Sequence, residues 1–463
     1  MVPPTEQEQQ ELLTACFRRS ELTLEQLWTR YFALGGSQNM LELDAYLHGL
    51  ALLPRIDRDM LAHAVNERLD ELSGPKRAPY SRPMRATKPL HGPLRALIDL
   101  LEGTHRAPPE RLPAVVTAAA DALNLRIGVY LADYDQNVLI PLLPATSPNL
   151  DIATTAAGDA FRRATSTVIR EEGPPVLWTV LLDGVERLGV LEVTSTDGTD
   201  PDDPVLRQQC QWLATLIGHL VTSVTQYGDG LDVQRRRYHR GSPSELLWHA
   251  LPPLTGATDA VVVGASLRPA YELSGTAFDY SLSEHRAKLA LFDTGARGGA
   301  PSLAVVTALS AYRSARRDGA SLAAQHAAIT GVLGERPDAP AVDGLVAELD
   351  LHTGDLRWLT SGSRAPVVVR RGAPPRPSAG PEAGQLRLRP GDLFAVCCRG
   401  TLETPDPPGA PFGAEGVKRV MDRHADSPAP EIARRITDAV AGHHGSALPD
   451  DVGVVVVRWT PPT

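Results

Sequence analysis

Hydrophobic positions along the first 72 residues recur at the spacing of an α-helix. The segment LEQLWTRYFALGG places four apolar residues on one helical face before two glycines: Leu24, Leu27, Tyr31 and Leu34. Similar patterns predict helices over about 41–52 and 57–72. Residues 1–72 are therefore predicted to form a helical module. Because they carry no catalytic motif, we interpret this module as an interaction module.

The hydrophobic period stops at residues 73–92, which hold four prolines and five basic residues but no acidic one. Proline stiffens such a segment, and like charges extend it. We therefore expect a linker that separates the helical module from the next domain.

A different order of elements is predicted over residues 93–225. Helical patterns near 94–102 and 109–123 precede a strand near 126–133. The segment VLWTVLLDGVERLGVLEV then gives two apolar runs around the turn dipeptide Asp183-Gly184, which predicts a hairpin. A long amphipathic helix, QWLATLIGHLVTSV, closes the region, which is predicted to be an α/β domain.

An arginine-rich connector, residues 226–243, leads into the last part of the chain, residues 244–463. We expect Ser244 to cap a short helix that stops before Pro252. After it, apolar strands alternate with helices near 302–318 and 321–333, and turns such as 352–354 join several strands as hairpins. This pattern favours antiparallel sheets packed between helices over a doubly wound parallel sheet.

Composition excludes several classes of protein. The net charge of −9 argues against a nucleic-acid partner. Four cysteines lack the spacing of a zinc site or a disulfide framework, so a cytoplasmic location is expected. The longest apolar stretch, residues 212–224, is too short for a membrane span, and residues 1–10 do not resemble a signal peptide.

The helix-flanked antiparallel sheet and the hairpin around LLDGVERLGVL resemble the GAF family of small-ligand sensors. The resemblance covers residues 93–225 and implies a sensor domain with a small-molecule ligand. It does not identify that ligand, because no cysteine stands at a tetrapyrrole attachment site and no Cys/His pair at an iron site.

Five motifs in the last part of the chain resemble, in order, those of the PPM-type serine/threonine phosphatases of bacteria, in their SpoIIE-like branch. They are LRPAYELSGTAFDYSL, LALFDTGARGG, LTSGSRAPVVVRR, CCRGTLET and LPDDVGVVVVRW. The resemblance implies an α-β-β-α sandwich over residues 244–463. The expected fold class is thus multidomain α+β: a helical module, a GAF-like α/β sensor and a PPM-type sandwich.

The PPM resemblance also implies a chemistry. Aspartates of the acidic motifs hold two Mn²⁺ or Mg²⁺ ions, which activate a water molecule to attack a phosphoserine or phosphothreonine. A pair of dications lowers the pKa of the bound water and neutralises the phosphoryl oxygens, and such hard cations need carboxylate oxygens.

The motifs of this chain depart from that pattern. Asp293 and Asp450 stand at two ligand positions, whereas Thr276 and Arg399 replace the aspartates of Gly-Gly-Asp and Thr-Asp-Gly. Two further differences affect the second motif and the hairpin: Ala296-Arg297-Gly298 replaces Gly-His-Gly, and Thr360-Ser361-Gly362-Ser363 replaces Asn-Ala-Gly-His. Accessory roles are assigned to two other acids, Asp279, expected to be structural, and Asp451.

Arg399 carries a permanent positive charge, which repels a dication. We expect it to form a salt bridge with Asp293 or Asp450 in place of a metal. The leading hypothesis is therefore a signalling regulator whose output domain is a pseudophosphatase that binds a phosphoprotein, by family analogy one of a sigma-factor pathway. Such a regulator needs no metal ion, nucleic acid or membrane as a partner. The sequence does not decide whether it forms a homodimer.

Two alternatives remain. The chain is an active Mn²⁺- or Mg²⁺-dependent phosphatase with a reduced metal site, in which Glu403 or Asp406 replaces a lost ligand. Alternatively, ligand binding by the GAF-like domain is the main activity, and the rest of the chain serves dimerisation.

Overall fold

The computed structural model describes residues 5–34, 36–72, 91–105, 107–170, 173–269, 271–335, 338–361, 367–369 and 383–461. The chain divides into two compact units, Met1–Pro89 and Leu90–Thr463. Almost all of the predicted linker lies outside the described residues. Within the described ranges, no helix combines the length and the hydropathy that a membrane crossing requires.

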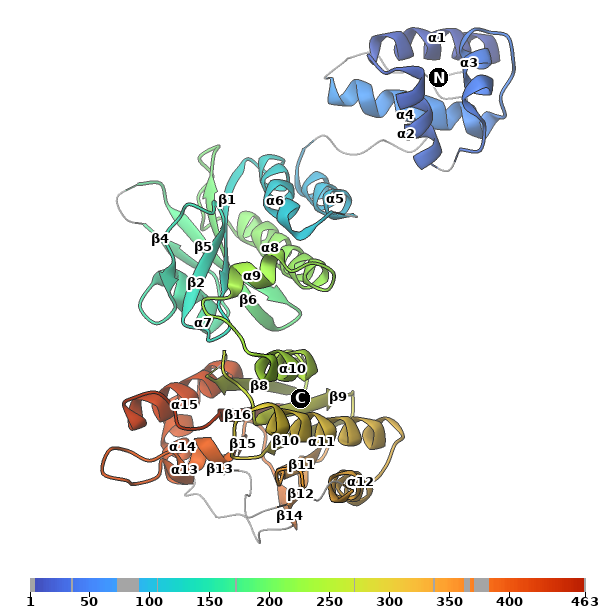
Figure 1. Cartoon of the computed structure of the whole chain (residues 1–463). Coiled ribbons are helices and arrows are strands. Elements are labelled where there is room, and N and C mark those ends of the chain that lie inside the picture. Colours follow the sequence, from blue (N-terminus) through green and yellow to red (C-terminus); the bar gives the residue numbers. More distant parts are fainter. Residues whose placement is uncertain are drawn as a thin grey trace. The chain divides into compact units, whose positions relative to one another are not determined.

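The first unit contains four helices among its described residues (Figure 1): α1 (Glu6–Arg19), α2 (Leu24–Ala33), α3 (Met40–Leu47) and α4 (Arg55–Glu71). Helices α1 to α3 each begin with a capping box, at Thr5, Thr23 and Asn39, where two backbone N–H groups are satisfied by side chains. The sequence pattern had not indicated α1, and α3 ends five residues earlier than expected.

The second unit begins with a sheet covered on both faces. Helices α5 (Pro93–Thr104), α6 (Leu112–Asp121) and α8 (Pro204–Thr225) pack on one face, and α7 (Ala156–Arg163) packs on the other. The strands are β1 (Leu125–Ala132), β2 (Val138–Leu143), β3 (Leu150–Asp151), β4 (Thr167–Ile169), β5 (Val176–Asp183) and β6 (Glu186–Ser195). Their order is β3-β2-β1-β6-β5-β4, and every neighbouring pair is antiparallel. We call residues 91–225 the middle part.

Two further antiparallel sheets form the C-terminal part, residues 242–461. One has the order β14-β12-β11-β10-β9 and the other β13-β15-β16-β8-β7. The first sheet contains β9 (Thr276–Leu282), β10 (Arg286–Asp293), β11 (Asp343–Asp350), β12 (Asp355–Ser361) and β14 (Ala383–Arg387). The second contains β7 (Thr255–Thr258), β8 (Val261–Arg268), β13 (Val367–Val369), β15 (Leu393–Cys397) and β16 (Val452–Trp459).

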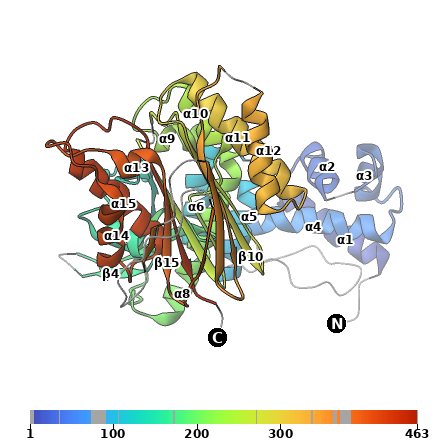
Figure 2. The same cartoon turned by 90° about the horizontal axis from the view of Figure 1, so that it is seen from below.

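Helices cover the outer face of each sheet. Helices α11 (Gly299–Arg317) and α12 (Leu322–Gly334) pack on the first sheet, and α15 (Ala429–His444) packs on β8 and β16 of the second. Helices α13 (Arg399–Glu403) and α14 (Gly413–Arg423) lie on the same side as α15 (Figure 2). β16 is apolar along almost its whole length because the facing sheet covers one side and α15 the other. The result is the α-β-β-α arrangement that the sequence predicted.

The connector joins the middle part to the first motif of the C-terminal part. It contains the short helix α9 (Gly230–Arg235), and α10 (Ser242–Ala250) follows. We had expected Ser244 to cap α10, but this prediction was wrong. Gly241 is the N-cap residue, and the Ser244 hydroxyl donates a hydrogen bond to the carbonyl of Leu273, 2.7 Å away. The buried Arg240 guanidinium stacks on Tyr134 of the middle part, 3.7 Å from the ring centroid.

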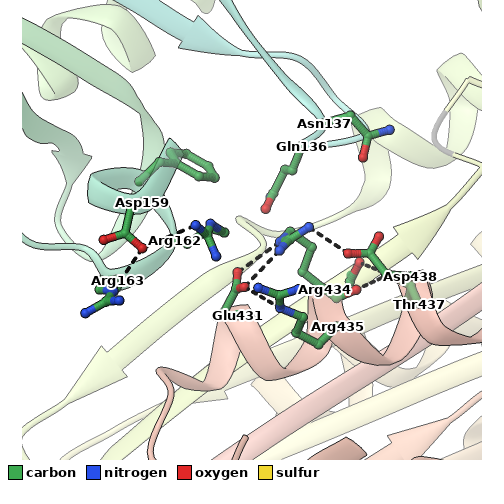
Figure 3. Close-up of polar contacts among 12 residues, drawn as sticks. Gln136, Asn137, Asp159, Arg162, Arg163, Glu431, Arg434, Arg435, Thr437 and Asp438 are labelled. Atoms are coloured by element: carbon green, nitrogen blue, oxygen red, sulfur yellow. Dashed lines mark hydrogen bonds and ion pairs between the residues drawn. The ribbon is translucent and has the colours of Figure 1, made fainter. Parts of the chain in front are cut away.

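Charged side chains of the middle part and of α15 meet in a buried cluster (Figure 3). Arg187 on β6 is 3% exposed, and its Nη1 lies 3.8 Å from Glu431 Oε2. Arg434 donates to both oxygens of the Glu431 carboxylate, over 2.8 and 2.9 Å. Arg268 on β8 contacts Asp438 of α15 (2.7 Å) and Asn137 of the middle part (2.9 Å). Paired charges thus hold the two parts together.

A second contact between the middle part and the C-terminal part predicts that the stability of the fold depends on pH. Glu186, on β6, accepts a hydrogen bond from the backbone N–H of Thr255 on β7. Burial raises the pKa of Glu186 from 4.5 to about 7. Because the folded pKa exceeds the unfolded one, this group stabilises the fold fully below about pH 4.5 and loses that contribution as the pH rises to about 7.

We therefore expect Glu186→Gln, which keeps the acceptor but cannot ionise, to flatten the stability profile across this window by about 3 kcal/mol. Urea midpoints measured at several pH values for the wild type and the variant check this. Glu415→Gln, at an exposed position of α14, should leave the profile unchanged. Parallel profiles for wild type and Glu186→Gln would contradict the assignment.

Candidate functional site

The first and second motifs meet where two neighbouring strands pair. Thr276 begins β9, Asp293 ends β10, and the register places them opposite each other. The Thr276 hydroxyl donates to Asp293 Oδ1 over 3.3 Å, and the backbone N–H of Gly295 donates to the same oxygen over 2.8 Å. Asp293 is 2% exposed, so these donors replace the water that its carboxylate would otherwise bind.

In the third motif, the backbone of Arg399 contacts the carboxylate of Asp293. Arg399 is the first residue of α13, and its N–H donates to Asp293 Oδ2 over 2.7 Å. Its guanidinium Nη2 pairs with Asp343 Oδ2 at 3.1 Å, which is a different acid from the two that we had expected. The guanidinium also lies against Gly295, where an added Cβ would come within 2.6 Å of Arg399 Cζ. Gly295 has a φ of +59°, so both space and backbone favour glycine there.

The terminal motif clamps the first motif. Asp451 is fully buried, and its Oδ2 accepts the N–H groups of Ser274 (2.9 Å) and Gly275 (2.7 Å). Burial raises the pKa of Asp451 to about 6. Gly400 packs so closely that a Cβ there would lie 2.0 Å from the Asp451 carbonyl oxygen. Asp451 therefore positions the loop before β9.

Asp450 is half-buried beside these groups. Burial raises its pKa, and the charge of Asp293 raises it further, whereas the cations Arg297 and Arg399 oppose the change. The effect of the Asp293 charge on Asp450 shows that Asp450 lies within the electrostatic field of this site. The structure thus brings together four residues that the sequence singled out: Thr276, Asp293, Arg399 and Asp450.

Asp279 belongs to another cluster. It is 2% exposed on β9, and both of its oxygens accept hydrogen bonds from Arg313 of α11, over 3.0 and 3.1 Å. Arg316 donates to Oδ2 as well, over 2.8 Å. This arrangement ties the first sheet to its covering helix.

The sequence did not indicate Asp343 as a site residue, and it did not indicate the contact that Arg297 makes. Asp343 begins β11 directly opposite Asp293, and only the pairing of β10 with β11 brings it there. Arg297, from the altered Gly-His-Gly position, has its Nε 4.0 Å from Asp451 Oδ1. The departure at that motif was visible in the sequence, but the contact with the terminal motif was not.

The residues present do not fit a pair of divalent cations. At the four positions where the PPM resemblance led us to expect metal ligands, the chain has two carboxylates, a guanidinium and a hydroxyl. Within the part of the chain that the structure describes, no group of three or more His, Cys, Asp or Glu is arranged to hold a metal ion. Of the acids considered as replacements, Asp406 instead accepts the N–H of Ala410 in the loop after α13. Residues 362 and 363 of the hairpin motif lie outside the described residues.

Comparison with known proteins agrees with this architecture. The family model described as stage II sporulation protein E (SpoIIE) matches residues 283–460. Among curated proteins, none matches the chain.

Several solved structures match part of this chain at low sequence identity. The RsbU and RsbW domains of a Mycobacterium tuberculosis protein are 20% identical, with a TM-score of 0.38 over 45% of this chain and 63% of that one. The PP2C phosphatase domain of SpoIIE from Bacillus subtilis, with a fragment of its regulatory domain, is 20% identical, with a TM-score of 0.39 over 44% and 63%. The SiaA PP2C domain of Pseudomonas aeruginosa is 18% identical, with a TM-score of 0.39 over 51% and 98%.

This chain thus covers less than two thirds of the first two structures. The matched segment runs from the turn before β10 through β16, and it contains the second, hairpin, third and terminal motifs. Residues 283–460 form a SpoIIE-family domain with the PPM phosphatase fold.

Proposed function

We propose that this chain is a signalling regulator in which a GAF-like sensor, the middle part, controls a SpoIIE-type domain that binds a phosphoprotein partner without hydrolysing it. The partner would be a phosphorylated regulator, by analogy one of a sigma-factor pathway. The helical module of the first unit would serve a further protein contact.

The observation that carries the proposal is the position of Arg399. Its backbone binds Asp293, and its side chain forms an ion pair with Asp343 on the neighbouring strand. A fixed positive charge between carboxylates neutralises them and repels a dication. A phosphate group, in contrast, is attracted by such a charge, because guanidinium binds phosphate well.

The sensor assignment is supported by the six-stranded antiparallel sheet with helices on both faces, and by its contacts with the SpoIIE-type domain. The connector reaches the first motif directly: the N–H of Arg237 donates to the hydroxyl of Tyr271, three residues before Ser274. A change in the middle part therefore has a short physical route to the site.

Metal titration by calorimetry tests the pseudophosphatase. We expect the wild-type chain to bind no Mn²⁺ below about 1 mM, because the Arg399 charge opposes it. The double variant Thr276→Asp, Arg399→Asp restores the two acids and should bind Mn²⁺ measurably. Arg357→Asp, at an exposed position of β12, is the matched charge control and should behave as the wild type. Tight Mn²⁺ binding by the wild type would overturn the proposal.

One observation favours a second candidate, an active Mn²⁺- or Mg²⁺-dependent phosphatase with a reduced site. The side chains of Arg399 and Asp343 are 35% and 34% exposed, so this pair can separate at modest cost and free a third carboxylate. Under this alternative, Mn²⁺-dependent release of phosphate from a phosphoserine peptide is abolished by Asp450→Ala and by Asp343→Asn. Under the pseudophosphatase proposal, neither variant changes a background that is already metal-independent.

A further inference from the structure

A groove runs between α14 and α15, on the outer side of the second sheet of the C-terminal part. One wall is a stripe of α14 residues, Gly416, Arg419, Val420 and Arg423, and the other is a stripe of α15 residues, Arg435, Asp438, Ala439 and His443. Both sets follow the three- and four-residue spacing of one helical face. Phe412 lies at one end of the groove and His424 at the other.

The charge of this groove is strongly one-sided. Three arginines line it, Arg419, Arg423 and Arg435, against one acid, Asp438. That acid is already neutralised, because its carboxylate lies 2.6 Å from Arg434 Nη1 and 2.7 Å from Arg268 Nη2. Figure 3 shows Arg434 between Glu431 and Asp438. Arg435 is likewise paired, with Glu431 Oε1 at 2.9 Å. The exposed Arg419 and Arg423 therefore give the lining its net positive charge.

The pKa of His424 reflects the positive electrostatic potential of this groove. Burial lowers its pKa, and the charges of Arg435, Arg423 and Arg434 lower it further, against the effect of Glu431. A proton is thus disfavoured at this end of the groove by the same cations that would attract an anion.

The lining between these cations is apolar. Val420 and Ala439 both line the groove and are partly exposed, and the Phe412 ring packs against His443. Arg419 and Arg423 on the rim are exposed. A partner that matches this surface needs apolar side chains on one face and acids beside them.

The groove extends toward the middle part. His424 and Arg435 also line a second groove, together with Arg162 and Arg163 of α7. The acids Asp159, Asp426 and Glu431 balance the charge of this second groove. The positive surface is therefore concentrated between α14 and α15. A peptide segment bound in that groove would end where the C-terminal part meets the middle part.

We propose that the groove between α14 and α15 is a docking surface for an acidic, amphipathic segment of a partner protein. The surface shares no residue with the motif site. Its occupation is therefore independent of whether that site binds or hydrolyses phosphate.

A fluorescence anisotropy titration of the full chain tests this proposal. The probe is a fluorescein-labelled peptide of about 14 residues with glutamates on one helical face and leucines on the other. We expect saturable binding that weakens about tenfold or more when Arg419→Glu and Arg423→Glu are combined. The matched pair Arg317→Glu, Arg357→Glu, at exposed positions of the same part, should leave affinity unchanged.

A second variant tests the groove without changing charge. Ala439→Trp places a bulky ring in the groove and should weaken peptide binding to a similar extent. The melting temperature of the chain should not change. Rising salt should weaken wild-type binding, because exposed charges are screened. Equal affinity of the charge-reversed variant, equal binding of a lysine-substituted peptide, or stronger binding of duplex DNA or anionic vesicles would each overturn the proposal.

Discussion

Glu431→Ala is expected to destabilise the second unit by about 3–5 kcal/mol, because it leaves buried cations without their counter-charge. The Glu431 carboxylate accepts from Arg434 twice and from Arg435 over 2.9 Å, and it is the acid beside Arg187. Although burial opposes ionisation, the hydrogen bonds and charge of Arg434 lower the pKa of Glu431. The side chains of Arg187 and Arg434 are 2% and 4% exposed, so water cannot replace the lost carboxylate.

Urea unfolding followed by circular dichroism measures this loss. Glu415→Ala is the matched control, because this acid lies on the neighbouring helix α14 with a side chain that is 81% exposed. We expect the control to change stability by less than about 0.5 kcal/mol. Glu431→Gln keeps one acceptor and should fall between the two. A loss below about 1 kcal/mol for Glu431→Ala would show that the cluster does not hold the two parts together.

Asp279→Ala is expected to cost a similar amount, about 3–5 kcal/mol, and to do so without any direct effect on the motif site. This acid receives three hydrogen bonds from Arg313 and Arg316 of α11 and is fully enclosed between the first sheet and that helix. Asp279→Asn retains an acceptor but loses the charge and should have a smaller cost.

The control for Asp279 is an exposed pair of the same chemistry. Asp355 pairs with Arg387 at 3.0 Å, but its side chain is 42% exposed, so Asp355→Ala should be nearly neutral. Thermal melting checks stability, and binding of the proposed phosphoprotein partner checks function. If Asp279→Ala kept full stability but abolished binding, Asp279 would belong to the site rather than to the packing of α11.

The sequence predicted the layered C-terminal architecture because its signals are local. Apolar runs such as VGVVVVRW and hairpin turns with glycine specify strands and their antiparallel connections without reference to the rest of the chain. Helix α1 was missed because its mean composition is polar, and the helix depends on a capping box at Thr5 and on burial of only a few residues.

The candidate site was predicted in part for the same physical reason. Motif positions located Thr276, Asp293, Arg399 and Asp450 along the chain, whereas the partner of the Arg399 guanidinium depends on strand register. Asp343 lies 56 residues from Arg399 and becomes its partner only because β11 pairs with β10. The predicted helix-capping role of Ser244 was wrong for the same reason, because its hydroxyl donates a hydrogen bond to Leu273 in a loop 29 residues away.

The clamp between Asp451 and the loop before β9 also constrains the order in which the domain can be assembled. These contacts join residues 176 and 177 positions apart, and β16, which follows Asp451, is the central strand between β15 and β8. During synthesis, every other strand of the domain emerges before the one that must lie in the middle. The second sheet cannot close, and the first motif cannot be held in place, until that strand has been made. A nascent chain therefore exposes the edge of β8, and later that of β15, until β16 has been made. This makes the domain a candidate client for chaperones that cover unpaired strands.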